Sequence, residues 1–199
     1  MGRRIKVLGI FGSPRKGGNT DLLLEEALKG AEKDGAEVTR LRLRDYTITP
    51  CLECHGCDST GQCVVLDDME KIYPVLLEAD VVFFASPIFF YSISAWAKAL
   101  VDRSQALWAR KYRLKDPSLG KEAKRRKGFF ISVGATKGQK LFEGAVLTVK
   151  YFFDVINADY VGDLLLKGIE EKGDILKHPE ALHQAFEAGE KLVKEFREA

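Results

Sequence analysis

The sequence predicts an α/β fold built on a doubly wound, five-stranded parallel sheet. Short apolar runs alternate with amphipathic segments along the whole chain, and several runs are almost continuously apolar, as strands buried on both faces are. Loops rich in glycine, serine and proline follow these runs. Because no repeat or linker divides the 199 residues, we expect a single domain over 1–199, with a cysteine-rich loop inserted at about 47–66.

The first unit is a strand, a loop and a helix. Ile5–Phe11 is the apolar strand, Ser13–Thr20 is a loop of turn formers and hydroxyls, and a helix begins at Thr20 or Asp21. The loop has neither the Gly-Lys-Ser/Thr ending of a Walker A loop nor the G-x-G-x-x-G dinucleotide pattern. A cradle of hydroxyls and amides with Arg15 suits a phosphomonoester such as that of FMN. The alternative is a glycine-rich turn before a capped helix.

The later segments continue the alternation of strands and helices. We expect strands at Glu37–Leu43, Ala79–Ala85, Gly128–Val133 and Tyr160–Leu166. We expect helices near Met69–Glu78, capped by Asp67 or Asp68, from Ser92 through Val101, through Val146–Phe153, and over His178–Ala199. This order implies a flavodoxin-like arrangement with strand order 2-1-3-4-5.

Three predicted loops leave the carboxyl ends of the central strands. They are Ser13–Thr20, Pro87–Tyr91 and Gly134–Thr136. Ligands of such sheets bind at this edge, so the loops describe a pocket with phosphate donors, aromatic contacts and small residues that admit a flat ring. We expect FMN there. For Phe89, Phe90 and Tyr91, ordinary packing is the alternative.

All four cysteines follow the second strand, within thirteen positions. Cys51, Cys54, Cys57 and Cys63 have the spacing C-x2-C-x2-C-x5-C. The first three resemble the run that wraps a cubane cluster, which favours [4Fe–4S] over zinc or a redox-labile loop. Disulfides are the least favoured use, because no secretory segment is present and a cytoplasmic location is expected.

Charge and hydropathy limit the classes of binding partner that we expect. The net charge is +2, which gives no general affinity for nucleic acid, and no apolar run has the length of a membrane span. Arg110–Lys127 holds nine basic residues. It is interpreted either as a solvated surface or as a docking face for an acidic electron-transfer protein or the 2′-phosphate of NADP.

The chain resembles the iron–sulfur flavoproteins, within the NADPH-dependent FMN reductase-like group. The matching pieces are Gly12–Thr20, the four-cysteine loop, Asp67–Met69, Ser86–Ile88 with the aromatic pair, and Lys98–Arg103. The resemblance implies FMN bound by Ser13, Arg15, Asn19 and Thr20 at the phosphate, by Pro87, Ile88 and Phe89 near the ring, and by Gly134, Ala135 and Thr136. It also implies a [4Fe–4S] cluster on the four cysteines. Relatives often carry tyrosine where Phe89 stands.

The implied function is electron transfer between a ferredoxin-like donor and a quinone, O2 or peroxide. No side chain is expected to act as a catalytic acid or base. One alternative is an NAD(P)H-dependent FMN or quinone reductase without a cluster, and another is a non-catalytic redox-sensing flavin module. Because the second strand is the outer one, we expect a homo-oligomer in which one subunit's cluster approaches another's flavin, with the apolar face of Ile93–Val101 and nearby Trp108 and Tyr112 as interface. The alternative is burial of that face against the chain's own sheet, which is favoured for Ile93, Ala97 and Leu100 over Trp96 and Trp108.

Overall fold

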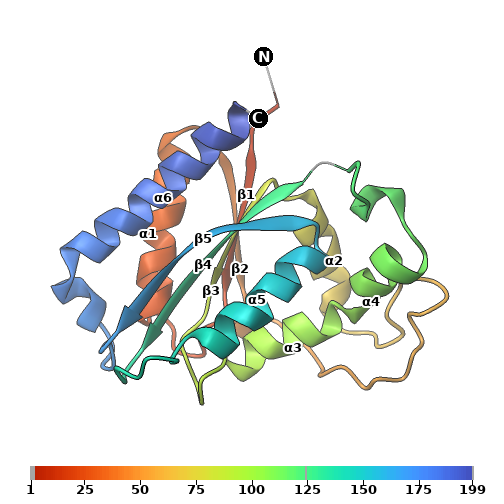
Figure 1. Cartoon of the computed structure of the whole chain (residues 1–199), viewed down its shortest axis with the longest axis horizontal. Helices are drawn as coiled ribbons and strands as arrows, with labels where there is room; N and C mark the ends of the chain where they lie inside the picture. The colour runs from red at the N-terminus through yellow and green to blue at the C-terminus, as the bar shows by residue number, and fades with distance from the viewer. Residues whose placement is uncertain (1–2, 124, 199) are drawn as a thin grey trace.

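Five parallel strands form one sheet in the order β2-β1-β3-β4-β5 (Figure 1). The structure is a computed structural model that describes residues 3–123 and 125–198. The strands are β1 (Lys6–Phe11), β2 (Glu37–Arg42), β3 (Val81–Ala85), β4 (Arg126–Gly134) and β5 (Ala158–Lys167). The flavodoxin-like topology predicted from the sequence is confirmed.

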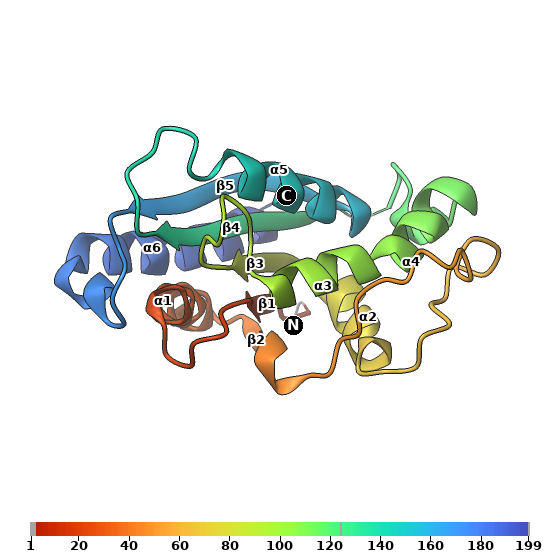
Figure 2. The same ribbon diagram turned by 90° about the horizontal axis from the view of Figure 1, so that it is seen from below.

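Helices cover both faces of the sheet. On one face lie α1 (Asn19–Lys33) and α6 (Pro179–Arg197), and on the other lie α2 (Met69–Glu78), α3 (Ala95–Arg103) and α5 (Glu143–Val155) (Figures 1 and 2). The continuous apolar run of β3 follows from this arrangement. Val81, Phe83 and Ala85 belong to the core beneath α1 and α6, whereas Val82 and Phe84 belong to the core beneath the other helices.

Helices α1 and α6 pack backbone to backbone at two glycines. A Cβ atom on Gly30 would lie 2.0 Å from the carbonyl oxygen of Phe186, and one on Gly189 would lie 1.9 Å from that of Ala27. No other residue allows so close a crossing. This contact fixes α1, and therefore the loop that precedes it, against the C-terminal helix.

Short helical turns complete the chain. They are η1 (Leu43–Asp45), α4 (Gln105–Trp108), η2 (Ala109–Arg113, a π-turn), η3 (Pro117–Leu119) and η4 (Asp174–Lys177). The predicted start of α3 at Ser92 is wrong. Phe89 and Ser92 exchange two backbone hydrogen bonds of 2.9 and 3.0 Å, which hold Ser92 in a hairpin turn, and Ser94 caps the helix through Ala97. The predicted end of the last helix, Ala199, lies outside the described residues.

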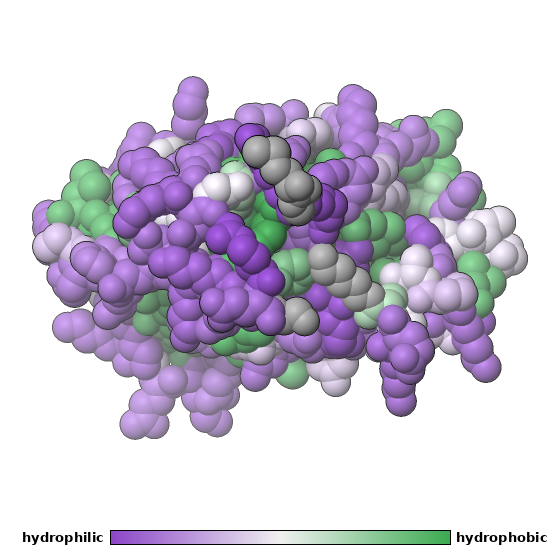
Figure 3. All heavy atoms as spheres, turned by 90° about the horizontal axis from the view of Figure 1, so that it is seen from above, coloured by the Kyte–Doolittle hydropathy of each residue, from purple (hydrophilic) through white to green (hydrophobic). Residues whose placement is uncertain are grey.

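The two edges of the sheet differ in character. At the edge where the strands begin, the surface is mostly hydrophilic (Figure 3), with ion pairs such as Arg3–Asp80 and Lys6–Glu78. The loops that leave the opposite edge bear the predicted site residues (Figure 2). None of the helices in the described part of the chain is long and apolar enough to cross a membrane.

Candidate functional site

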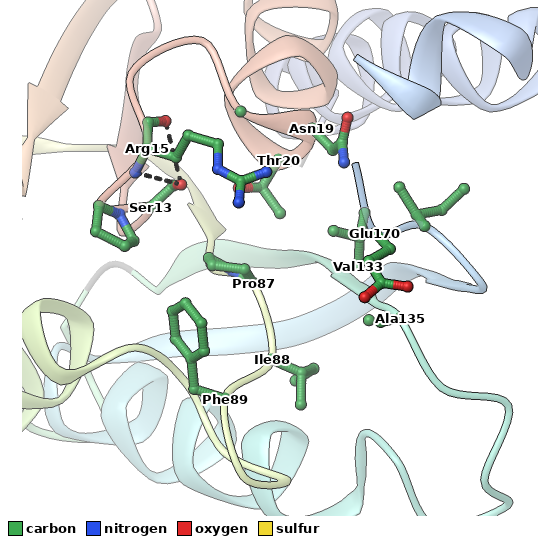
Figure 4. A pocket seen from close by; sticks show the side chains of 14 residues that line it. Ser13, Arg15, Asn19, Thr20, Pro87, Ile88, Phe89, Val133, Ala135 and Glu170 are labelled. Atoms are coloured by element: carbon green, nitrogen blue, oxygen red, sulfur yellow. Dashed lines mark hydrogen bonds between the residues drawn. The ribbon is translucent and has the colours of Figure 1, made fainter. Parts of the chain in front are cut away.

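A cavity of about 430 Å³ opens where β1, β3 and β4 end. The three predicted loops line it, with every predicted contact residue except Thr136, which is exposed outside it. Ser13, Arg15 and Thr20 gather on one side, and Ile88 and Phe89 lie on the opposite side (Figure 4). Lining residues that sequence reasoning missed are Pro14, Gly18, Val133, Ile169 and Glu170.

The phosphate loop, Ser13–Thr20, is held by its own hydrogen bonds. The Ser13 hydroxyl accepts from the Arg15 N–H at 3.1 Å, and the Gly18 N–H donates to the Arg15 carbonyl at 3.0 Å. A Cβ atom on Gly18 would lie 3.2 Å from the Ser13 hydroxyl, so a side chain would crowd the cradle. The loop therefore presents the N-terminus of α1 and the exposed Arg15 to the cavity, an arrangement suited to a phosphate.

A buried ion pair supports this loop from behind. Asp21 accepts hydrogen bonds from the Gly17 N–H at 3.0 Å and from Arg44 at 2.9 Å, and Arg44 also donates to the Ser13 carbonyl at 3.3 Å. Burial raises the pKa of Asp21, although Arg44 and the Gly17 N–H oppose that shift. Arg44 thus offsets a carboxylate that would otherwise lie uncompensated beneath an anion site.

The Asn19 side chain fixes a distant loop. Its amide donates to the Glu171 carbonyl at 2.9 Å, and its oxygen accepts from the N–H groups of Gly173 and Ile175 at 3.0 and 3.3 Å. These contacts tie the segment after β5 to the N-terminus of α1. Asn19 lines the cavity as predicted, but its side chain clamps the loop, which leaves its backbone to face a phosphate.

The other side of the cavity is built for a flat group. The Ile88 N–H donates to the Val133 carbonyl at 3.0 Å, which continues the sheet beyond β3. A Cβ atom on Gly134 would lie 2.8 Å from Leu141, so this position has no room for a side chain. Glu170 lies beside Val133 and Ala135 and brings a carboxylate to this end of the cavity (Figure 4). Its place directly after β5, at the ligand edge, was the signal that could have identified it.

All four cysteines line a second cavity of about 410 Å³. Their thiols are free, with Cys51 and Cys54 exposed and Cys57 and Cys63 half-buried. Within residues 3–123 and 125–198, no three His, Cys, Asp or Glu side chains form a group that could hold a single metal ion. Four free thiols around one cavity are nevertheless the donor set that a cluster uses, because its thiolates bind separate irons and need not converge on one point.

Comparison with known proteins identifies the family. The family model for NADPH-dependent FMN reductase matches residues 5–166. The chain belongs to this family. An iron–sulfur flavoprotein of Methanocaldococcus jannaschii is 35% identical over 161 residues, which cover 80% of this chain and 77% of that protein. The predicted membership of the iron–sulfur flavoproteins is thereby confirmed, and the chain is an FMN-dependent oxidoreductase.

Two further relatives cover almost the whole chain. A Bacillus subtilis protein named as an NAD(P)H-dependent FMN-containing oxidoreductase is 27% identical over 96% of this chain and 97% of its own length. The NAD(P)H:quinone oxidoreductase of Methanothermobacter marburgensis has a similar structure, with a TM-score of 0.70, 17% identity and coverage of 96% and 98%. The second likeness concerns the fold alone.

Helix α3 joins the two cavities of this flavoprotein. At its start, the Ser94 hydroxyl donates to the Gly12 carbonyl at 2.5 Å, directly before the phosphate loop. At its end, Val101 and Arg103 line the cysteine cavity. At about 1.5 Å per residue, this helix spans roughly 13 Å. None of the described residues lines both cavities, so the cysteine cavity is separate from the first one.

The basic segment Arg110–Lys127 is largely occupied by ion pairs and hydrogen bonds. Arg125 binds Asp159, Lys127 binds Glu195, and Arg126 donates to the carbonyls of Ile156 and Leu77. Arg110, Lys111 and Arg113 also have acidic partners, and Lys124 lies outside the described residues. This pairing favours the interpretation as a solvated surface over that as a docking face.

Proposed function

We propose that the chain is an electron-transfer flavoprotein that holds FMN in the first cavity and a [4Fe–4S] cluster in the second. It would pass electrons from a low-potential donor, such as a ferredoxin-like protein or NAD(P)H, to an acceptor such as a quinone, O2 or peroxide. The observation that carries this proposal is the placement of four free cysteines around one cavity. The cavity adjoins the end of helix α3, and the residue that caps the start of this helix, Ser94, is bonded to Gly12, directly before the phosphate loop.

The residues of the chain bind and orient, and the cofactors supply the chemistry. FMN, when bound, exchanges two electrons or one, and an iron–sulfur cluster exchanges one at a time. Arg15 and the α1 N-terminus would hold the phosphate, while Ser13 fixes the shape of the loop. Pro87 and Gly134 would shape the ring site, and no side-chain acid or base is required.

Metal and cofactor analysis of anaerobically purified protein tests this proposal. We expect one FMN, four irons and four acid-labile sulfides per chain, by the stoichiometry of a cubane cluster. The double variant Cys54→Ser, Cys57→Ser should lose the iron and sulfide and keep the FMN, whereas His55→Ala, in the same loop, should keep both. Stoichiometric zinc without sulfide in the wild-type protein would contradict the proposal that the cysteines hold a cluster.

The second candidate is an NAD(P)H-dependent FMN or quinone reductase without a cluster. It is favoured by the match to the Bacillus subtilis oxidoreductase over 96% of this chain and 97% of that protein. Turnover rates separate the candidates. Reduction of a quinone by NAD(P)H at equal rates in wild type and in the double cysteine variant would support the reductase without a cluster.

A homo-oligomer also remains a proposal. Phe90, Tyr91, Trp96, Leu147 and Tyr151 are exposed apolar side chains, and Phe90 is fully exposed. Tyr91 packs its backbone against Gly144, and Leu147 and Tyr151 follow at three and seven residues on the same face of α5. We propose that a second copy of the chain covers these exposed side chains. A single monomeric species in sedimentation of the FMN-loaded protein would exclude it.

A further inference from the structure

Among the described residues, Arg103 is the largest fully buried side chain, and it ends α3 at the wall of the cysteine cavity. Its side chain is 0% exposed. Arginine is almost never fully buried unless it is paired. The role of this buried charge therefore needs an explanation.

The guanidinium joins the two ends of the cysteine loop. It donates to the Thr49 carbonyl at 2.8 Å, before Cys51, and to the Val65 carbonyl at 3.0 Å, after Cys63. Both ends of a fifteen-residue segment, 50–64, are thus held by one side chain. When the ends of a loop are already fixed, the binding of a metal centre does not have to offset the entropic cost of closing the loop.

Asp67 completes this closure. Its two carboxylate oxygens accept from Arg103 at 2.5 and 3.2 Å, and they also accept from the N–H groups of Thr49 and Met69 at 2.9 and 3.0 Å. Burial alone would raise the pKa of Asp67, but the bonds from Arg103 and the two backbone N–H groups lower it. The Tyr73 hydroxyl donates to the Arg103 carbonyl at 2.7 Å and fixes the end of α3.

The closure leaves one donor unused. Within the described part of the chain, the Nε atom of Arg103 is buried without a hydrogen-bond partner. A buried donor without a partner destabilises the folded state, and a buried ion pair is by itself a weak source of stability. An apolar residue would close the cavity wall at lower cost. The charge is explained if the cavity holds an anionic group.

We propose that Arg103 is a positioning residue for the metal centre. It closes the cysteine loop before the centre is bound, and its positive charge then stabilises the reduced, more negative centre. This inference rests on the proposed function, because the second step requires a cluster in the cavity. A nearby positive charge favours the uptake of an electron, so its loss should move the midpoint potential of the cluster to more negative values.

Two variants and a control separate the two steps. Arg103→Gln removes the charge and the fork, Arg103→Lys keeps the charge and loses the fork, and Arg126→Gln is the control. Arg126, at the start of β4, is half-buried, binds the backbone carbonyls of Ile156 and Leu77, and has a buried Nε without a partner in the described structure, but it does not line the cysteine cavity.

Hydrogen exchange of the metal-free protein tests the first step. In both Arg103 variants, the amide hydrogens of residues 47–66 should exchange about tenfold faster than in wild type, as expected for the loss of about one hydrogen bond. Arg126→Gln should leave these amides unchanged. Equal exchange in wild type and Arg103→Gln would overturn the closure, whatever metal the protein binds.

Spectroscopic redox titration of the iron-loaded, FMN-loaded protein tests the second step. Arg103→Gln should lower the midpoint potential of the cluster and leave that of FMN unchanged, because Arg103 does not line the flavin pocket. Arg103→Lys should keep the cluster potential near that of wild type. An unchanged potential in Arg103→Gln, at full iron content, would overturn the electrostatic role. Wild-type protein without iron and sulfide would refute the proposed function instead, and the exchange result would still stand.

Discussion

The phosphate loop and the cysteine loop leave the same edge of the sheet, yet they are held in different ways. In the phosphate loop, Ser13 and Thr20 are buried, and the backbone and side chains bond to one another within a few residues. In the cysteine loop, Leu52 and Val64 are 65% and 59% exposed, and apart from the ion pair of Asp58 with Arg113 the main fixed points are at its base. One site is formed before its ligand arrives, whereas the other has a fixed base and an open tip.

The largest expected effect comes from breaking the Arg103–Asp67 pair that holds the base of the cysteine loop. Asp67→Asn leaves the buried charge of Arg103 without its carboxylate, and breaking one side of a buried pair costs about 3 kcal/mol of the free energy of unfolding. Urea unfolding of the metal-free protein at neutral pH measures this loss. Asp102→Asn is the control, since its exposed pair with Lys98 should contribute less than about 0.5 kcal/mol.

The same pair predicts a pH dependence. Because the folded-state pKa of Asp67 is lowered, its stabilisation is present above the ordinary value of 3.8 and is lost as the pH falls through the lowered pKa. The difference between wild type and Asp67→Asn should therefore shrink in acid. A difference that stays constant from pH 7 to pH 3 would contradict this account.

The next effect concerns the preformed site. Arg15→Ala should weaken FMN binding about tenfold to a hundredfold, because a hydrogen bond to a charged group contributes about 1.5–3 kcal/mol. Lys16→Ala is the matched control, since Lys16 is exposed but does not line the cavity. Fluorescence titration with FMN measures both. Equal losses in the two variants would mean that general charge, and not the Arg15 contact, attracts the phosphate.

Sequence reasoning identified the parts of the molecule that depend on local pattern. Continuous apolar runs predicted the buried strands, and a turn-rich loop before an amphipathic helix predicted one lining of the cavity, including Ser13 and Arg15. The cysteine spacing predicted that the four thiols lie close together, and all four cysteines line one cavity. These features are encoded within a few residues of one another.

The rest depends on contacts between distant segments. The Asn19 amide binds the Glu171 carbonyl across 152 positions, and Arg103 binds Asp67 across 36. No local pattern distinguishes a buried arginine at the end of a helix from an exposed one. The start of α3 was misplaced because Ser92 is held by a backbone bridge to Phe89, which competes with capping.

The smallest expected effect compares backbone strain in the cysteine loop with that in the loop after β3, on the other side of the first cavity from the phosphate loop. Phe90 and Tyr91 have φ values of 49° and 62°, and in the cysteine loop Glu53 and His55 have values of 51° and 59°. Such angles cost a residue with a Cβ atom about 1 kcal/mol when its surroundings enforce them. The positive φ angle of Tyr91 is enforced by the bridge between Phe89 and Ser92 and by the contact of the Tyr91 carbonyl with Gly144.

Glycine and alanine at these positions isolate the strain, because both remove the ring. Tyr91→Gly should be more stable to urea than Tyr91→Ala by somewhat less than about 1 kcal/mol, since glycine also gains freedom in the unfolded chain. His55→Gly and His55→Ala should differ less in the metal-free protein, because the open tip of the cysteine loop can relax. Equal differences at both positions would show that the cysteine loop is as rigid without metal as the flavin side, and would remove the distinction between a preformed and an open site.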